Sequence, residues 1–419
     1  MAGRRALGRR FGWLWAAFAV SSYGTGLGFG ALPLLAVLVL HCGPAQVAAL
    51  AATGRAVGAL VAVPLGPWVE FRRKRPVMVA MDLIRFAALL SVAAAFALGR
   101  LGFAQLLLVS VVTAAADIAF KAASGAYLKA LVPPADLLVA NSRFESTTWT
   151  STMVGPPLGG AAIGLFGPVT TVVADAVSYL LSALGIRAIG GTEPVPERSG
   201  AARLRAGDLL AGWRHILGHA ALRPLFLNSI VVNGLIMASQ PLLAVLMLGR
   251  LGFAPWQYGL AFAAPCVGGL LGSRLAHPLA ARFGPHRVLR ASGALRSCWP
   301  LGLAFVQPGV PGLTIVLVVQ LGVVTGCGVF NPLLATSRLD HTAPDRVART
   351  LAAWSISSSA AIAAVTALWG LLAAATGPRT AIAAAGVLLL ATPLLLPRRA
   401  NASRDEPTGT GVRAAVDRA

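Results

Sequence analysis

Long apolar runs separated by short polar loops dominate the chain. A helix needs roughly 20 mainly apolar residues to cross a bilayer, because only a backbone that satisfies its own hydrogen bonds tolerates hydrocarbon. Twelve stretches meet this requirement. We expect membrane helices near residues 11–40, 45–69, 76–98, 104–131, 141–165, 168–189, 223–248, 255–281, 286–306, 312–333, 347–375 and 378–396.

A single long polar interruption divides these helices into two sets of six. The sequence therefore predicts an all-α membrane protein in which two six-helix bundles repeat one another. A shift of 211 residues places Val77 on Val288 and Arg85 on Arg296. The expected parts are a cytoplasmic N-terminus (1–10), the N-terminal bundle (11–189), a cytoplasmic linker with an amphipathic helix (190–222), the C-terminal bundle (223–396) and a disordered cytoplasmic tail (397–419).

Composition and charge support a membrane protein. Hydrophobic residues make up 57% of the chain and charged residues 12%, which excludes an ordinary soluble domain. The net charge is +21, but the cations gather in alternate short loops, as the positive-inside bias requires. We therefore expect a multi-pass protein of a bacterial cytoplasmic membrane with both termini inside, and no nucleic acid as partner. The four scattered cysteines indicate buried hydrophobic residues rather than a metal site, and no cofactor is expected.

The loop after the second expected helix combines a glycine, an acid at the helix end and a basic cluster. Such a loop can hold one face of a bundle closed through ionic contacts. We expect Asp82 and Arg85, which lie one helical turn apart nearby, to pair with each other or with this loop. The predicted cytoplasmic gate therefore comprises Gly66, Glu70, Arg72, Arg73, Lys74, Arg75, Asp82 and Arg85.

The fifth expected helix contains a Gly-Pro-Pro-Leu-Gly-Gly sequence that begins at Gly155. Prolines cannot donate backbone hydrogen bonds and glycines admit close packing, so we expect this helix to be bent and pressed against a neighbour. Together with the basic loop, this sequence resembles the signatures of the major facilitator superfamily. The residues that resemble its antiporter signature are Gly155, Pro156, Gly159 and Gly160.

A narrower resemblance, over about residues 9–396, is to the enterobactin-exporter and macrolide-efflux branch of that superfamily. It rests on Ser21 to Gly26, on Asp82 to Arg85 and on Asn141 to Glu145. The chain departs from the family pattern at Glu70-Phe71, where an aspartate-arginine pair is usual, and at Thr25, where an aspartate is common. The resemblance implies a twelve-helix transporter that alternately opens a central site to either side.

Ionisable residues inside the membrane are costly and need a partner or a water-filled cavity. No Asp or Glu occurs between Asp208 and Asp340, so a proton-carrying carboxylate is expected in the first half. Asp117 is the leading candidate, although Lys121 at i+4 can neutralise it. Asp175 is the second, with a packing hydrogen bond to Tyr179 as its alternative role, and Glu145 is the third.

Polar side chains within apolar spans can line a central cavity or serve helix packing. Arg55 can counter Asp117 or bind an anionic substrate. The candidates for the cavity are Tyr23, Thr25, Arg55, Asn233, Gln240 and Gln320. His215 and His219 have a spacing that can present two metal ligands, but no third ligand follows at a suitable spacing, and a linker helix at the membrane surface explains them better.

These features favour a secondary active exporter of a small amphipathic or hydrophobic compound, driven by proton antiport. Its expected partners are membrane lipid, the small-molecule substrate and protons, and we expect a monomer. An importer or lipid transporter of the same fold, or a transport-inactive sensor or scaffold, is the alternative. No phosphate-binding loop, carboxylate cluster or histidine-rich site indicates an enzyme.

Overall fold

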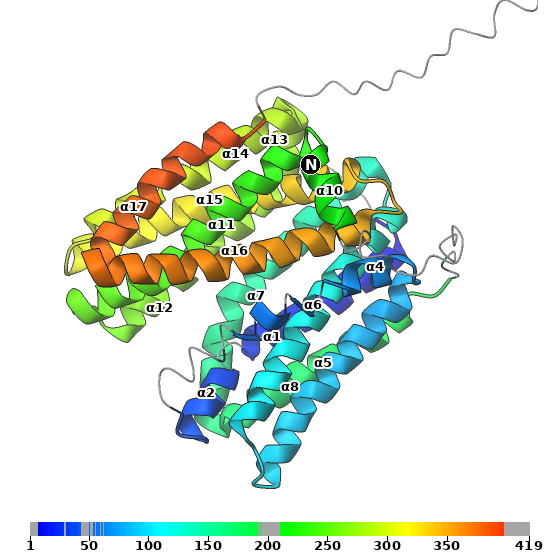
Figure 1. Cartoon of the computed structure of the whole chain (residues 1–419), viewed down its shortest axis with the longest axis horizontal. Coiled ribbons are helices and arrows are strands. Elements are labelled where there is room, and N and C mark those ends of the chain that lie inside the picture. The colour runs from blue at the N-terminus through cyan, green and yellow to red at the C-terminus, as the bar shows by residue number, and fades with distance from the viewer. Residues whose placement is uncertain are drawn as a thin grey trace, which may run out of the picture.

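A computed structural model of the chain consists of helices, with no strand among the residues it describes (Figure 1). Those residues are 7–28, 31–42, 63–191, 193 and 210–397, together with isolated positions between 50 and 61. Eight of the described helices are long and apolar enough to cross a membrane.

The first half forms one bundle. Its helices are α1 (Arg9–Leu27), α2 (Ala31–Leu38), α4 (Leu65–Glu70), α5 (Lys74–Ala97), α6 (Phe103–Leu131), α7 (Leu137–Phe166) and α8 (Pro168–Arg187), with a short 3₁₀ turn, η1 (Pro134–Asp136), before α7. A short helix of the linker, α10 (Ala211–Gly218), precedes the second bundle.

The second bundle consists of α11 (Leu222–Ala244), α12 (Pro255–Ala263), α13 (Cys266–Phe283), α14 (Pro285–Cys298), α15 (Val310–Asp340), α16 (Val347–Thr376) and α17 (Pro378–Ala391). A π-helical turn, η2 (Val245–Arg250), extends α11, and 3₁₀ turns η3 (Pro300–Phe305) and η4 (Thr392–Leu395) extend α14 and α17.

The observed helices follow the apolar runs closely, and most differences occur where a proline or glycine lies. The expected helix at 255–281 is interrupted at Ala264-Pro265, and the one at 286–306 becomes 3₁₀ from Pro300, because proline removes a backbone donor. Only the end of the helix expected at 45–69 lies within the described residues, as α4.

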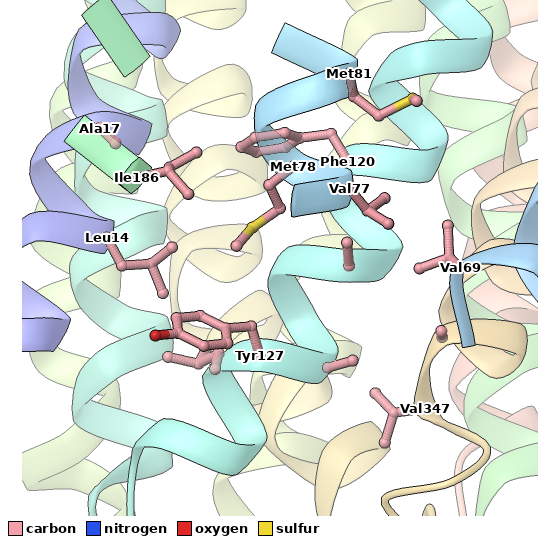
Figure 2. Close-up of a cluster of buried hydrophobic side chains, with 14 of the residues drawn as sticks. Leu14, Ala17, Val69, Val77, Met78, Met81, Phe120, Tyr127, Ile186 and Val347 are labelled. Atoms are coloured by element: carbon pink, nitrogen blue, oxygen red, sulfur yellow. The ribbon is translucent and has the colours of Figure 1, made fainter. Parts of the chain in front are cut away.

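A buried cluster of apolar side chains holds the N-terminal bundle together near the end that carries the linker (Figure 2). Leu14 of α1, Met78 of α5, Phe120 of α6 and Ile186 of α8 meet there. Val347, the first residue of α16, belongs to the same cluster although it lies in the second half of the chain. The core of the first bundle therefore extends into the second bundle at this end.

Small residues bring the helices of the second bundle close together. A Cβ on Gly272 of α13 would lie 2.6 Å from the carbonyl oxygen of Thr325 in α15. Close packing of this kind is what binds helices in lipid, where apolar side chains gain little by leaving a hydrocarbon solvent. Large apolar side chains accordingly face outward, including Leu165, Leu371 and Leu108.

The two bundles repeat one another in detail. Gly167 and Gly377 both have positive φ angles, of 84° and 90°, and each is followed by a proline that begins the next helix. Arg85 and Arg296, which a shift of 211 residues superimposes, are both buried. A repeat detected from sparse identities thus corresponds to equivalent structural positions.

The bundles diverge from the end that carries α4 and α10, which we call the linker end (Figure 1). At this end they touch through α4 and α16, α6 and α16, and α7 with α13 and α15. The Lys129 side chain of α6 donates hydrogen bonds to the carbonyl oxygens of Leu339 and Thr342 across this contact. The structure is therefore closed at the linker end and opens toward the opposite end.

Candidate functional site

A cavity of about 1600 Å³ lies between the two bundles. Aromatic side chains from α1, α6, α7, α8 and α12 contribute to its largely apolar wall, which charged and amide groups interrupt. The charged residues are Arg85, Asp117, Lys121, Glu145 and Arg338, and the amides are Asn141, Asn233, Gln240, Gln320 and Asn331.

Glu145 of α7 is the carboxylate in the cavity wall whose side chain contacts the opposite bundle. Its Oε1 accepts a hydrogen bond from Nε1 of Trp149, one turn along the same helix, at 2.9 Å. The same oxygen accepts a hydrogen bond from Nδ2 of Asn331 on α15, in the other bundle, at 2.7 Å. Both donors are neutral, so neither hydrogen bond brings a positive charge to Glu145. The hydrogen bond from Asn331 must change if the bundles move apart here.

Asp117, the leading candidate from sequence, is held by two cations. Oδ2 lies 2.6 Å from Nζ of Lys121, and Oδ1 lies 3.4 Å from Nη1 of Arg85. Arg85 also pairs with Asp82 and packs against the rings of Phe120 and Tyr179. These partners all belong to the N-terminal bundle, so a rigid movement of one bundle against the other leaves them intact.

Asp175 lies between α8 and α1. Its Oδ1 accepts a hydrogen bond from Oγ1 of Thr25 at 3.3 Å, and Oγ1 of Thr25 is also 2.8 Å from Oη of Tyr179. Thr25 thus joins the two side chains that the sequence suggested would bond directly. The arrangement ties two helices of one bundle together.

Four of the six cavity candidates line the cavity: Thr25, Asn233, Gln240 and Gln320. Nε2 of Gln320 lies 3.5 Å from Oε1 of Gln240, at the limit of a hydrogen bond between α15 and α11. Tyr23 is not among the lining residues and is 37% exposed. Arg55 lies outside the described residues.

The acid of the predicted gate loop forms its ion pair with the opposite bundle. Glu70 pairs with Arg349 of α16, whereas Nζ of Lys74 donates to carbonyl oxygens at the end of α4. Arg75 donates to the carbonyl oxygens of Gly190 and Gly191 at the start of the linker. Burial raises the pKa of Glu70 to about 7, with Arg349 opposing this rise.

Replacing Arg349 by alanine should open the linker end more often. Without the guanidinium, burial keeps Glu70 protonated at neutral pH, so an ion pair is lost but no buried charge remains. We expect the closed state to lose about 1–2 kcal/mol of stability relative to the open state, which lowers the ratio of closed to open protein by a factor of about 5–30.

The labelling rate of a cysteine placed at buried Thr342, in an otherwise cysteine-free protein, measures this change. Arg346→Ala is the control because Arg346 is exposed and pairs with its neighbour Asp345, so equal acceleration in both variants would contradict the gate.

The glycines of the antiporter-like sequence face two environments. A Cβ on Gly155 would lie 2.6 Å from the backbone of Gly26 in α1, and one on Gly159 would lie 2.2 Å from the carbonyl oxygen of Leu27. A Cβ on Gly160 would meet nothing within 4 Å. Pro156 faces the cavity. Close approach of α7 to α1 therefore requires Gly155 and Gly159.

Gly155→Val should destabilise the protein because backbone atoms of α1 cannot move aside as a side chain can. We expect the free energy of unfolding to fall by about 1–3 kcal/mol, the usual range for overpacking. Gly160→Val in the same helix is the matched control and should have little effect. Thermal unfolding in detergent compares the two, and equal melting temperatures would refute the role of Gly155.

The linker helix packs on α16 rather than lying apart from the bundles. Nε1 of Trp213 donates to Oγ of Ser357 at 2.8 Å. His219 lies with its ring centroid 5.8 Å from that of His215 and 5.4 Å from that of His341 at the end of α15. Burial lowers the pKa of His219, and the two neighbouring histidines lower it further. Among the described residues, no group of three His, Cys, Asp or Glu side chains is arranged to hold a metal ion.

The sequence analysis did not identify Trp149, Asn331 and Arg338 as residues of this site. Trp149 follows Glu145 by four residues, a spacing that places both on one helix face, so it was accessible to sequence reasoning. Asn331 adjoins a proline in an apolar run, which is a weaker signal. Arg338 lies in the part of α15 beyond the expected helix end at 333 and was assigned to a loop.

Comparison with known proteins agrees with this architecture. The sequence model of the Major Facilitator Superfamily matches residues 14–326 and, in a second match, residues 234–417. The multidrug efflux pump Tap of Mycolicibacterium fortuitum is 26% identical over 336 residues, covering 77% of this chain and 81% of that protein.

Solved structures show the same fold at low sequence identity. A bacterial homologue of the iron transporter ferroportin, in an outward-facing state, is 16% identical with a TM-score of 0.78, covering 93% of this chain and 98% of that one. The human organic anion transporter MFSD10 is 16% identical with a TM-score of 0.75, covering 93% and 99%. The matched sequence model, the paired helical bundles and the cavity between them establish that this chain is a membrane transporter of the Major Facilitator Superfamily.

Proposed function

We propose that this protein exports small amphipathic compounds by proton antiport, and that Glu145 carries the coupled proton. The observation that carries this proposal is the pair of hydrogen bonds that Glu145 accepts, one from its own helix and one from Asn331 in the opposite bundle. The charge of this side chain therefore acts directly on the contact between the bundles.

The ionised form of Glu145 favours the closed linker end. Hydrogen bonds to a carboxylate are roughly twice as strong as those between neutral groups. Protonation of Glu145 from the open side removes this advantage, weakens the Asn331 contact and favours separation of the bundles at the linker end. A proton that enters on one side thus favours the state that faces the other, which is the proton-driven half of an antiport cycle.

The cavity wall suits an amphipathic substrate. Phe18, Phe120, Phe144 and Tyr258 offer aromatic surface, while Asn233 and Gln320 offer neutral hydrogen-bonding groups. A few polar groups in an apolar wall fix the orientation of a bound molecule without demanding one particular structure. The multidrug efflux function of the Mycolicibacterium relative supports export as the direction of transport.

The proposed orientation places the linker end in the cytoplasm. The basic loop at Arg72 to Arg75 and the described linker helix α10, which carries Arg214, lie at this end, in agreement with the positive-inside bias. Under this assignment the structure is open to the outside.

Uptake of a fluorescent amphipathic dye into inverted membrane vesicles tests the proposal. Vesicles that contain the protein should accumulate dye when their interior is made acidic, and nigericin, which collapses the pH gradient, should abolish the accumulation. Vesicles from cells without the protein provide the baseline. Accumulation that survives nigericin would reject proton coupling, and accumulation only in right-side-out vesicles would reject export.

A further inference from the structure

Two charged side chains of the transport cavity are not paired with a neighbour of opposite charge. Arg85 and Lys121 both pair with Asp117 inside the N-terminal bundle. Glu145 of α7 and Arg338 of α15 face the same cavity from opposite bundles and interact electrostatically without forming an ion pair. We propose that the substrate of this site is a zwitterionic amphiphile, with its amine at Glu145 and its acid group at Arg338. This inference rests on the export function proposed above and names the substrate class.

Arg338 presents a guanidinium that stacking holds in place in the cavity wall. Its Cζ lies 4.9 Å from the centroid of the Trp354 ring, which is buried and packs edge-on against Phe226. Its Nε is buried without a hydrogen-bond partner, and its side chain donates no hydrogen bond to a residue that the structure describes. A guanidinium carries five donors in a fork that matches a carboxylate, and an unpaired charge is costly away from water. Arg338 is therefore prepared to bind the acid group of a ligand.

Glu145 uses only one of its two carboxylate oxygens for hydrogen bonds. Oε1 accepts the hydrogen bonds from Trp149 and Asn331. Oε2 accepts none from the part of the chain that the structure describes, and it is not sealed from solvent. The ammonium group of a ligand can therefore approach Oε2 from the cavity while Oε1 keeps its two donors.

The two charged groups are placed to bind one molecule. Asn331, which donates to Glu145, lies seven residues before Arg338 on α15, or about 10 Å along the helix axis. Side chains lean toward the N-terminus of their helix, so the Arg338 side chain leans back toward the level of Glu145. The remaining gap is wider than an ion pair, and a molecule whose amine and acid groups lie a few bonds apart can bridge it.

Charge balance in the cavity disfavours ligands with a single charge. An amine alone is repelled by Arg338, and an acid alone is repelled by ionised Glu145. A zwitterion places each of its charges beside the opposite one, and such complementarity selects between partners. Phe18 and Phe144, whose ring centroids are 4.7 Å apart, offer aromatic surface in the same cavity for the apolar body of the molecule.

The amine of the substrate also fits the proposed antiport cycle. A cation beside Glu145 favours the ionised form of the carboxyl group, so a substrate that binds from the cytoplasm promotes release of the proton. The ionised form then favours the closed linker end and release of the substrate outside. The acid group takes no part in this exchange, and its contact with Arg338 determines which amines bind.

Equilibrium binding to the full-length protein in lipid nanodiscs, measured by titration calorimetry at mildly alkaline pH, tests the proposal. The probes are biphenylalanine, biphenylethylamine and biphenylpropanoic acid, which share one apolar body and carry both charges, the amine alone or the acid alone. We expect the zwitterion to bind at least about 10-fold more tightly than either of the other two.

Variants of the two residues should change this ranking in different ways. Arg338→Gln should remove the advantage of the zwitterion over the amine, and Arg338→Lys should retain part of it. Glu145→Gln should remove the advantage of the zwitterion over the acid. Arg274→Gln is the matched control, because Arg274 is exposed and lies outside the cavity, and it should keep the ranking. Continued binding of the amine shows that Arg338→Gln is folded.

The unaltered protein decides the proposal even if a variant fails to fold. Equal affinities for the three probes, or a tighter complex with the amine or the acid than with the zwitterion, would overturn it. The same ranking in Arg338→Gln and Arg274→Gln would overturn it as well.

This measurement involves neither transport nor a pH gradient, so it is independent of the vesicle experiment. Proton-driven dye accumulation without a preference for the zwitterion would reject the substrate class alone. A preference for the zwitterion without proton-driven accumulation would reject the coupling alone.

Discussion

Replacing Glu145 by glutamine should reduce proton-driven accumulation of substrate to the level of vesicles that lack the protein. Glutamine keeps the size of the side chain and can still accept the hydrogen bonds of Trp149 and Asn331, so the cavity should remain intact. It cannot alternate between a charged and a neutral form, so it cannot couple a proton to the movement of the bundles. Exchange of labelled for unlabelled substrate, which needs no pH gradient, should persist.

Asp117→Asn and Asp175→Asn are the controls for this experiment. Asp117 is neutralised by Lys121 and Arg85, and Asp175 is bonded to Thr25, each within the N-terminal bundle. We expect both variants to retain dependence on the pH gradient, even if their rates fall. Full accumulation by Glu145→Gln would reject Glu145 as the proton carrier, and loss of coupling in Asp117→Asn alone would assign the proton to Asp117.

Gly269→Ala should shift the protein away from the state observed here. A Cβ on Gly269 of α13 would lie 2.3 Å from Cδ2 of Trp149, which belongs to α7 in the other bundle. The indole must then leave its place between the bundles and release Glu145. Overpacking of about 1–3 kcal/mol corresponds to a shift of about 5- to 150-fold in the balance of two states.

The shift can be measured as faster labelling of a cysteine at Thr342 on the closed linker end. Gly370→Ala in α16 is the matched control, because a Cβ at Gly370 would meet nothing within 4 Å. Trp149→Phe combined with Gly269→Ala offers a further check, since the smaller ring should restore part of the closed population. Equal labelling rates in the Gly269→Ala and Gly370→Ala variants would show that the contact between Gly269 and Trp149 does not favour the state closed at the linker end.

The membrane helices could be predicted from the sequence because the lipid environment imposes one simple requirement on them. A helix that crosses hydrocarbon must be long and apolar, so α6 (Phe103–Leu131) was predicted at 104–131 and α16 (Val347–Thr376) at 347–375. The rule fails where a helix leaves the lipid. The end of α15 near Asp340 meets the other bundle instead, so its polar residues were mistaken for a loop.

Only some of the interaction partners of the charged residues could be predicted from the sequence. Lys121 lies four residues from Asp117 and Arg85 lies three from Asp82, and helical geometry predicts such neighbours. Glu145 and Asn331, or Glu70 and Arg349, are far apart in the chain and come together only through the contact between bundles. No periodicity within one helix indicates such a contact. The sequence analysis therefore ranked Asp117 first, whereas our proposal, which uses the contact between the bundles, assigns the proton to Glu145.

Spin-label distances across the linker end test most directly whether the charge of Glu145 controls the bundles. Labels at exposed Ala135 and Ala343 report the separation. The cysteine-free protein that carries them also has Glu70→Gln, because burial raises the pKa of Glu70 to about 7 and its charge would otherwise change in the same pH range. We expect the fraction with long distances to rise as pH falls. With Glu145→Gln added, long distances should prevail at every pH. Distances that do not change with pH would contradict control of the bundles by the charge of Glu145. Distances that change with pH to the same extent in the Glu145→Gln variant would contradict it as well.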